Sequence, residues 1–229
     1  NLSINNTSAS GATLGAAITT TNVTGNIAVG NDNSGSLFNT NNLAINLGTR
    51  TITISQNSTL NKGTSVISSG VVTLLSGNIN GTTGAITGSS YSVQNGGISA
   101  IMAGTGGLTK TTGSTVTISG TNTYTGTTSI QGGILQFGAA NVLPNSPVVL
   151  AGGTLSTGAT SGFSEATGTL GLTANSTIAL GTGSHNLNFA ASNGVAWTAG
   201  RTLTITGWTT SNGSTGTSGR IYVGSNASG

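Results

Sequence analysis

Residues 107–136 read GLTKTTGSTVTISGTNTYTGTTSIQGGILQ, and this stretch shows the pattern on which the fold depends. In its segment 115–119, apolar and hydroxylic residues alternate with a period of two, which is typical of a half-buried β-strand. One face of such a strand enters a core, while the threonine hydroxyls face water and their β-branching suits the pleat. Glycine pairs at 106–107 and 132–133 indicate corners on either side of it.

The same alternation recurs along the chain, and no segment predicts a competing helix. The comparable segments are 43–47, 51–55, 176–180 and 202–206. The pairs expected to point into the core are Ile52 and Ile54, Val116 and Ile118, and Leu203 and Ile205. Between strands, the 39 glycines supply frequent turn signals such as Asn80-Gly81, Gly132-Gly133 and Gly152-Gly153. These patterns predict many short strands joined by glycine corners.

Short strands at such spacing are compatible with a sandwich, a barrel or a solenoid. Aromatic residues make up 4% of the chain, which suits a narrow solenoid core better than a wide globular one. Similar units end at Gly77, Gly120 and Gly207 without a strict period, and rows of Thr, Ser and Asn can form polar ladders between coils. We therefore predict an all-β chain folded over residues 1–229 as a single elongated β-solenoid.

Charge is scarce in this sequence. Its 229 residues include five Lys plus Arg, two Asp plus Glu and one His, or 3% charged residues against about 25% in a typical soluble domain. The cations are isolated, so no basic patch indicates a nucleic-acid partner. Cysteine is absent, which leaves neither a disulfide framework nor a thiolate metal site. No apolar run reaches the length of a transmembrane segment. This composition argues against most cytosolic enzymes.

The stretch 107–136 resembles the passenger-associated transport repeat of autotransporter passengers, a family of secreted bacterial β-helix proteins. The resemblance rests on Gly107-Leu-Thr-Lys110, Val116-Thr-Ile-Ser-Gly120, Asn122-Thr-Tyr-Thr-Gly126, Thr128, Ile130 and Gly132-Gly133-Ile-Leu-Gln136. One departure is Thr112-Gly113-Ser114-Thr115, where the family usually has a glycine before the strand, and this difference is expected to shift a turn.

The resemblance implies a right-handed parallel β-helix, or β-solenoid, exported to the bacterial surface or medium, with outer-membrane secretion machinery as its partner during export. It supplies no catalytic, cofactor-binding or metal-binding residue, so we predict none. The expected function is a non-catalytic structural or adhesive segment of a longer outer-membrane-associated surface protein. The alternatives are a glycan-binding adhesin and a subunit that self-associates into extracellular filaments. The export route is left open between an autotransporter barrel and a separate secretion system.

Individual polar residues give little sign of chemistry. A glycosidase normally needs two carboxylates, whereas Asp32 and Glu165 each stand alone in a polar loop segment. His185 is the only histidine and is expected to be a turn residue. Lys110 is a possible contact for an anionic sugar or lipid, but a solvated charge at the end of a strand is the favoured interpretation. Tyr124 and Gly126 are expected to serve packing and a corner.

Two further groups of residues suggest binding surfaces. Trp197 and Trp208 flank the 202–206 strand and are expected to cap an end of the solenoid rather than to stack on sugars. The threonine pairs 51/53, 115/117 and 202/204 suggest an ice-binding ladder, but they do not recur at a constant coil length, which ranks that function low.

Overall fold

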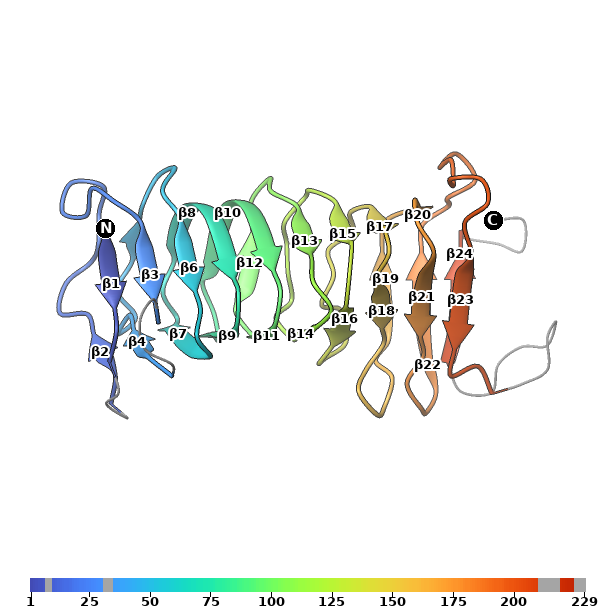
Figure 1. The fold of residues 1–229 in the computed structure, drawn as a ribbon, viewed down its shortest axis with the longest axis horizontal. Coiled ribbons are helices and arrows are strands. Elements are labelled where there is room, and N and C mark those ends of the chain that lie inside the picture. The colour runs from blue at the N-terminus through green and yellow to red at the C-terminus, as the bar shows by residue number, and fades with distance from the viewer. Residues whose placement is uncertain (7–9, 31–34, 210–218, 225–229) are drawn as a thin grey trace.

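The computed structural model describes residues 1–6, 10–30, 35–209 and 219–224, and the regular secondary structure of these ranges is entirely β-strand. Successive strands pair in parallel, and the chain winds through about eight turns into a β-solenoid. Figure 1 shows the turns stacked side by side from the N-terminal to the C-terminal end. The predicted all-β parallel solenoid is confirmed.

Sheet A is the first of two long sheets that run the length of the rod. Its strands, in spatial order, are β1 (Leu2–Ile4), β3 (Ile27–Val29), β6 (Ile52–Ile54), β8 (Ile67–Leu74), β10 (Ala85–Val93), β13 (Leu108–Lys110), β15 (Thr128–Ile130), β17 (Val148–Leu150) and β20 (Leu170–Leu172). Two short strands join it by pairing with β8 and β10, namely β5 (Ile45–Asn46) and β12 (Ile101–Ala103). Because β8 and β10 are long, they turn a corner and contribute to two faces.

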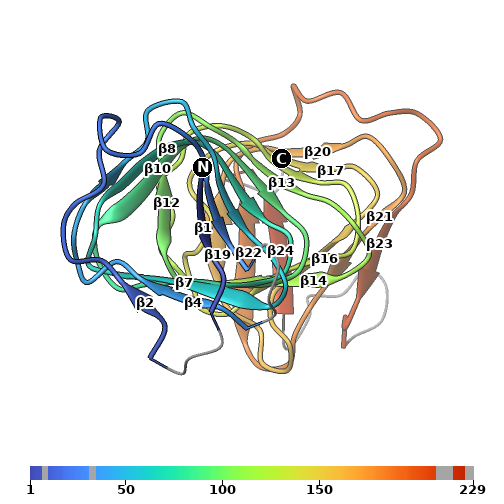
Figure 2. The same ribbon diagram turned by 60° about the vertical axis from the view of Figure 1, so that its left-hand side comes forward.

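Sheet B forms the opposite long wall. Its strands, in spatial order, are β2 (Ala12–Thr13), β4 (Leu37–Asn39), β7 (Ser58–Gly63), β9 (Gly77–Gly81), β11 (Gly96–Ile98), β14 (Thr115–Ile118), β16 (Ile134–Phe137), β18 (Thr154–Ser156), β21 (Ser176–Ala179) and β23 (Leu203–Thr206). A third sheet, sheet C, contains β19 (Glu165–Thr167), β22 (His185–Phe189) and β24 (Gly219–Val223) near the C-terminal end. Figure 2 shows how the faces enclose a continuous interior.

Coil length varies along the rod, whereas the strand register is regular except for one shift between β7 and β9 at Asn61 and Gly63. In the two long sheets, paired residues are as close in sequence as Ala85 and Ile101 and as distant as Ile178 and Ile205. The paired strands nevertheless keep their apolar side chains on the inner side, because the extra residues are accommodated in the corners. The irregular spacing of the sequence units therefore belongs to the corners.

The core is a stack of aliphatic side chains, as the alternation predicted. Ile52, Ile54, Val116 and Ile118 are all fully buried. Ile205 is different because it is 41% exposed on β23, the last strand of sheet B, so the predicted burial of this residue is wrong. The aromatic residues Phe38, Phe137, Tyr91, Tyr124 and Phe189 also lie in the core. The narrow interior thus uses its few rings as fillers.

Glycines occupy positions where coils approach closely. Gly77 and Gly96 stack on each other at the start of β9 and β11 with φ of 118° and 119°, a region that favours glycine. A Cβ on Gly96 would collide with the carbonyl oxygen of Gly77. Asn80-Gly81, predicted as a turn, instead ends strand β9, because both residues continue the pairing with β7.

Candidate functional site: buried polar side chains and an asparagine hollow

Lys110 is fully buried at the end of β13, so its interpretation as a solvated charge is wrong. Its Nζ donates to the carbonyl oxygens of Thr111 at 2.6 Å, Thr112 at 3.1 Å and Gly132 at 3.1 Å. The three ammonium donors are therefore matched by three acceptors, and Gly132 belongs to the next coil. Burial lowers the pKa of Lys110. The residue fastens two coils together and is not presented to a ligand.

Lys62 repeats this arrangement near the end of β7. It is also fully buried, and its Nζ donates to the carbonyl oxygens of Gly63 at 3.2 Å, Thr83 at 2.7 Å and Gly84 at 3.0 Å. Burial lowers the pKa of Lys62 as well. Because carbonyls at a corner point away from the strand ladders, a long side chain ending in three donors can satisfy several at once. Nothing in the local sequence pattern distinguished these two lysines from exposed ones.

The corner beside Lys110 contains Thr112-Gly113-Ser114-Thr115, the segment in which the sequence departs from the pattern that residues 107–136 otherwise resemble. Thr112 has a φ of 63°, which is rare for a β-branched residue. This conformation accompanies the bond from its carbonyl oxygen to Lys110 Nζ. This corner lies next to the buried ammonium, and the expected shift of the turn stays a prediction.

Glu165 lies in strand β19 and is 1% exposed, which corrects its expected place in a polar loop. Its Oε2 accepts from the backbone N–H of Val142 at 2.6 Å and of Leu143 at 3.1 Å, and Oε1 accepts from Ala166 N at 3.2 Å. Burial raises the pKa of Glu165 and outweighs the opposing effect of these donors. Asp32, the other acid, lies outside the described residues.

Asn122 and Glu165 connect β12 to β19 by side-chain hydrogen bonds, in a part of the solenoid where the described residues form no strand between these two. Asn122 Oδ1 accepts from Met102 N at 2.8 Å, and its Nδ2 donates to Val142 O at 2.7 Å. Glu165 then accepts from Val142 N, which connects this side-chain relay to β19 and sheet C. Two side chains thus supply hydrogen bonds that a backbone ladder would otherwise make.

His185 begins strand β22 and is 3% exposed, so it is a core residue rather than the expected turn residue. Its Nδ1 lies 2.9 Å from Gly183 O, and its Nε2 lies 2.9 Å from Thr157 Oγ1. Because a carbonyl can only accept, Nδ1 donates to Gly183 O, and in the neutral imidazole the Thr157 hydroxyl donates to Nε2. Gly181 N donates to the same hydroxyl oxygen at 2.8 Å. This chain of bonds lies within the core, and both side chains are enclosed.

The two tryptophans lie at the C-terminal end of the solenoid. Trp197 Nε1 donates to Leu170 O at 3.0 Å, and Thr198 N donates to Leu172 O at 2.9 Å, so their loop covers the outer edge of β20. Ser192 Oγ accepts from Leu170 N at 2.9 Å and completes this cap. Trp208 is partly buried against the core. Both positions agree with the predicted capping role, although 44% of Trp197 stays exposed.

Tyr124 and Gly126 have the predicted roles. The Tyr124 side chain is fully buried, its hydroxyl lies 2.7 Å from Thr128 Oγ1, and its ring centre lies 6.0 Å from that of Tyr91. Burial raises the pKa of the Tyr124 hydroxyl. A Cβ on Gly126 would meet the backbone of the preceding coil at Gly107, which identifies it as a tight corner.

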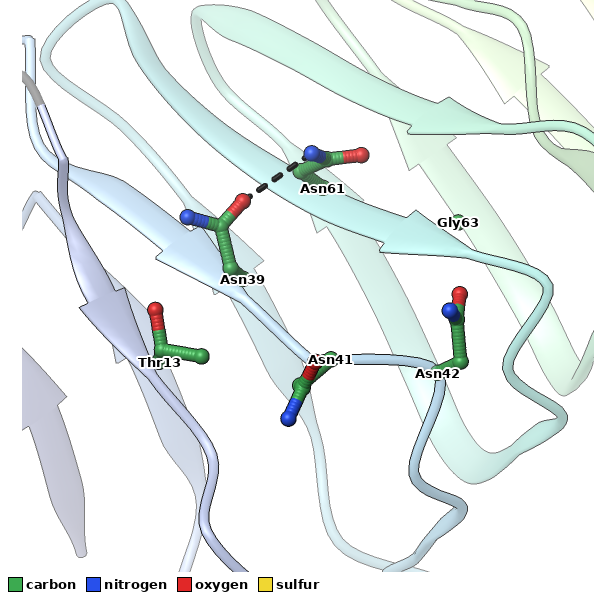
Figure 3. A pocket seen from close by; sticks show the side chains of 6 residues that line it. All are labelled: Thr13, Asn39, Asn41, Asn42, Asn61 and Gly63. Carbon is green, nitrogen blue, oxygen red and sulfur yellow. Dashed lines mark hydrogen bonds between the residues drawn. The ribbon is translucent and has the colours of Figure 1, made fainter.

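A polar hollow lies on the outer side of sheet B in the N-terminal coils. It has a volume of about 320 Å³ and is lined by Thr13, Asn39, Asn41, Asn42, Asn61 and Gly63. Figure 3 shows the asparagine side chains arranged around it, with Asn61 Nδ2 donating to Asn39 Oδ1 at 2.9 Å. Asn41 and Asn42 form its rim with φ of 53° and 58°, which asparagine tolerates. The hollow offers neutral amide donors and acceptors.

Within the described ranges, no group of three or more His, Asp or Glu side chains could hold a metal ion. No helix long and apolar enough to cross a membrane occurs in the part of the chain that the structure describes. No protein-family profile, no curated protein and no solved structure matches this chain.

Proposed function

We propose that this chain is a non-catalytic rod segment of a protein exported to the bacterial cell surface, where it acts as a structural or adhesive spacer. The proposal rests on the burial of the chain's few reactive side chains. Lys62, Lys110, Glu165 and His185 are buried, and each has hydrogen-bond partners that belong to the fold. Residues that would perform chemistry in an enzyme thus hold adjacent coils together here.

The shape and surface of the chain support the same role. Parallel strands stack along one axis, so each coil contacts its neighbours and the rod holds its ends apart (Figure 1). The resemblance of residues 107–136 to a passenger-associated transport repeat supports export to the surface. That stretch contains β13, β14 and β15, whose strands stack in the same way as those of neighbouring coils.

The location is tested by antibodies raised against the purified chain. Intact cells of the organism that encodes it are expected to bind the antibody, and brief treatment with external protease is expected to remove the signal. An antigen found only in the cytosolic fraction of lysed cells would contradict the proposal. A cytosolic enzyme measured in the same samples controls for lysis.

The asparagine hollow favours a second function, the binding of a neutral glycan. Amide groups both donate and accept, as sugar hydroxyls do, and no charged residue lines the hollow. The test is binding to an array of neutral glycans by the whole chain and by an Asn39→Ala, Asn61→Ala double variant. Binding that survives in the double variant would place any glycan site elsewhere. Asn186→Ala, on the exposed side of β22, is the matched control.

A further inference from the structure

Five successive coils of sheet A carry one hydroxyl each in a single outward-facing row. The hydroxyl row consists of Thr53, Thr73, Ser92, Thr109 and Ser129, which are direct partners in the strand pairing from β6 through β15. In Figure 1 these strands lie side by side along the middle of the rod. Since neighbouring strands lie ~4.8 Å apart, the row spans about 19 Å at a regular spacing.

Sequence spacing conceals this row. The intervals between its members differ because corners differ in length, yet the strands carrying them pair without a shift. The threonine pairs that first suggested a ladder do not form one: Thr53 is on sheet A, whereas Thr117 and Thr204 are on sheet B. The threonine pairs of the sequence are therefore not aligned, whereas single hydroxyl residues of successive coils are.

The hydroxyls of the row are available to an external partner. Within the residues that the structure describes, the side chains of Thr53, Thr73, Ser92 and Thr109 have no hydrogen bond to the protein. Ser129 Oγ has only a long contact, at 3.5 Å, from Gln131 Nε2. All five residues are partly exposed. Their backbones are held by the sheet, so the row offers donors and acceptors without a large loss of conformational entropy on binding.

The surroundings of the row are uncharged and lack an aromatic platform. In strands β6, β8, β10, β13 and β15, the only charged side chain is Lys110 and the only ring is Tyr91, and both are buried. This face therefore offers hydroxyl and methyl groups but no ring on which a ligand could stack. A charged group would hold water in a shell of its own, whereas methyl and hydroxyl groups at a fixed spacing can take part in an extended water network.

We propose that the hydroxyl row is a binding face for ordered water at the surface of ice. Each hydroxyl donates to and accepts from a water of the lattice, and the three threonines add methyl groups to the same face. The contacts form together because the row is rigid, so one bulky side chain in its middle separates the whole face from the surface. This function is independent of the spacer role and of the asparagine hollow.

The test is thermal hysteresis and inhibition of ice recrystallisation by the purified whole chain. We expect both effects in the native chain and their loss in Ser92→Tyr, at the centre of the row. Thr177→Tyr places the same ring on the outer side of sheet B and is expected to keep both effects. Melting curves followed by circular dichroism show whether both variants are folded. If Ser92→Tyr does not fold, Thr73→Val replaces it as the test variant. Thr73→Val removes one hydroxyl with little change of shape and should weaken both effects.

Two results would overturn the proposal. One is a native chain without either effect, and the other is activity unchanged by substitutions in the row. Sedimentation with insoluble cellulose or chitin is measured in parallel. Binding to either polymer that Ser92→Tyr abolishes, with no effect on ice, would show that the face serves a polysaccharide instead.

Discussion

Replacing Lys110 with methionine should destabilise the solenoid, although the change removes a buried charge. Methionine retains much of the side-chain volume but leaves the carbonyl oxygens of Thr111, Thr112 and Gly132 without their ammonium donor. A buried polar group left unpaired costs ~1–3 kcal/mol. The substitution also removes the cost of burying a charge, the same desolvation that lowers the pKa of Lys110. The net loss of stability should therefore lie at the low end of the total for the three carbonyl groups, about 3 kcal/mol.

Thermal unfolding and local hydrogen exchange measure this effect. For a chain of this size, each kcal/mol corresponds to ~2–4 °C, so the Tm of Lys110→Met should fall by about 6–12 °C. Since the coils of a solenoid can open separately, exchange should increase most at the amides of Gln131 and Ile134, in the coil that Lys110 contacts. Arg201→Met removes an exposed cation and should change stability by less than ~0.5 kcal/mol.

A Lys110→Met variant as stable as the native chain would refute this reasoning. It would mean that the corner carbonyls find water or relax when the ammonium is absent. A uniform rise in exchange along the whole rod would refute the local part of the argument, because the lysine contacts only its own corner and the adjoining coil.

Three further predictions concern other buried groups. Burial raises the pKa of Glu165 above its ordinary 4.5, so the stability due to its proton is complete below pH 4.5 and is lost as pH rises through the raised pKa. The Tm of the native chain should therefore fall over this pH range relative to the Tm of Glu165→Gln. Equal slopes of Tm against pH for the two chains would contradict a raised pKa at Glu165. Asn122→Ala unpairs two buried backbone groups and should cost ~2–5 kcal/mol in denaturant unfolding, while Asn186→Ala on an exposed side chain should be nearly neutral. Gly96→Ala meets the preceding coil at a φ of 119° and should destabilise by well over ~1 kcal/mol, whereas Gly113→Ala meets open space and should be neutral or slightly stabilising; similar melting temperatures for the two would show that the corner is not tight.

The sequence predicted the class of fold because its main determinant is local. Alternation with period two in segments such as 51–55 and 115–119 decides which side chains face inward. In a narrow interior, these aliphatic side chains pack mainly against those of the adjacent coils. The same rule failed at Ile205, because burial also requires a further coil over the strand, and β23 is the last strand of its sheet.

The roles of the polar residues were decided by tertiary structure. Lys110, Glu165 and His185 look like exposed or loop residues in sequence, because the groups that they bind come from other coils or from corners whose shape the pattern does not reveal. Trp197 and Trp208 lie at the C-terminal end of the solenoid as predicted, where Trp197 donates to β20 and Trp208 packs against the core.

By itself, the sequence determined a cysteine-free, nearly uncharged chain of alternating strands and glycine corners, because alternation and turn chemistry are properties of neighbouring residues. Only the tertiary structure decided which distant residues share a face. The hydroxyl row and the Asn122 to Glu165 relay both depend on register between coils of unequal length, and that register is set by backbone pairing and core packing rather than by distance along the chain.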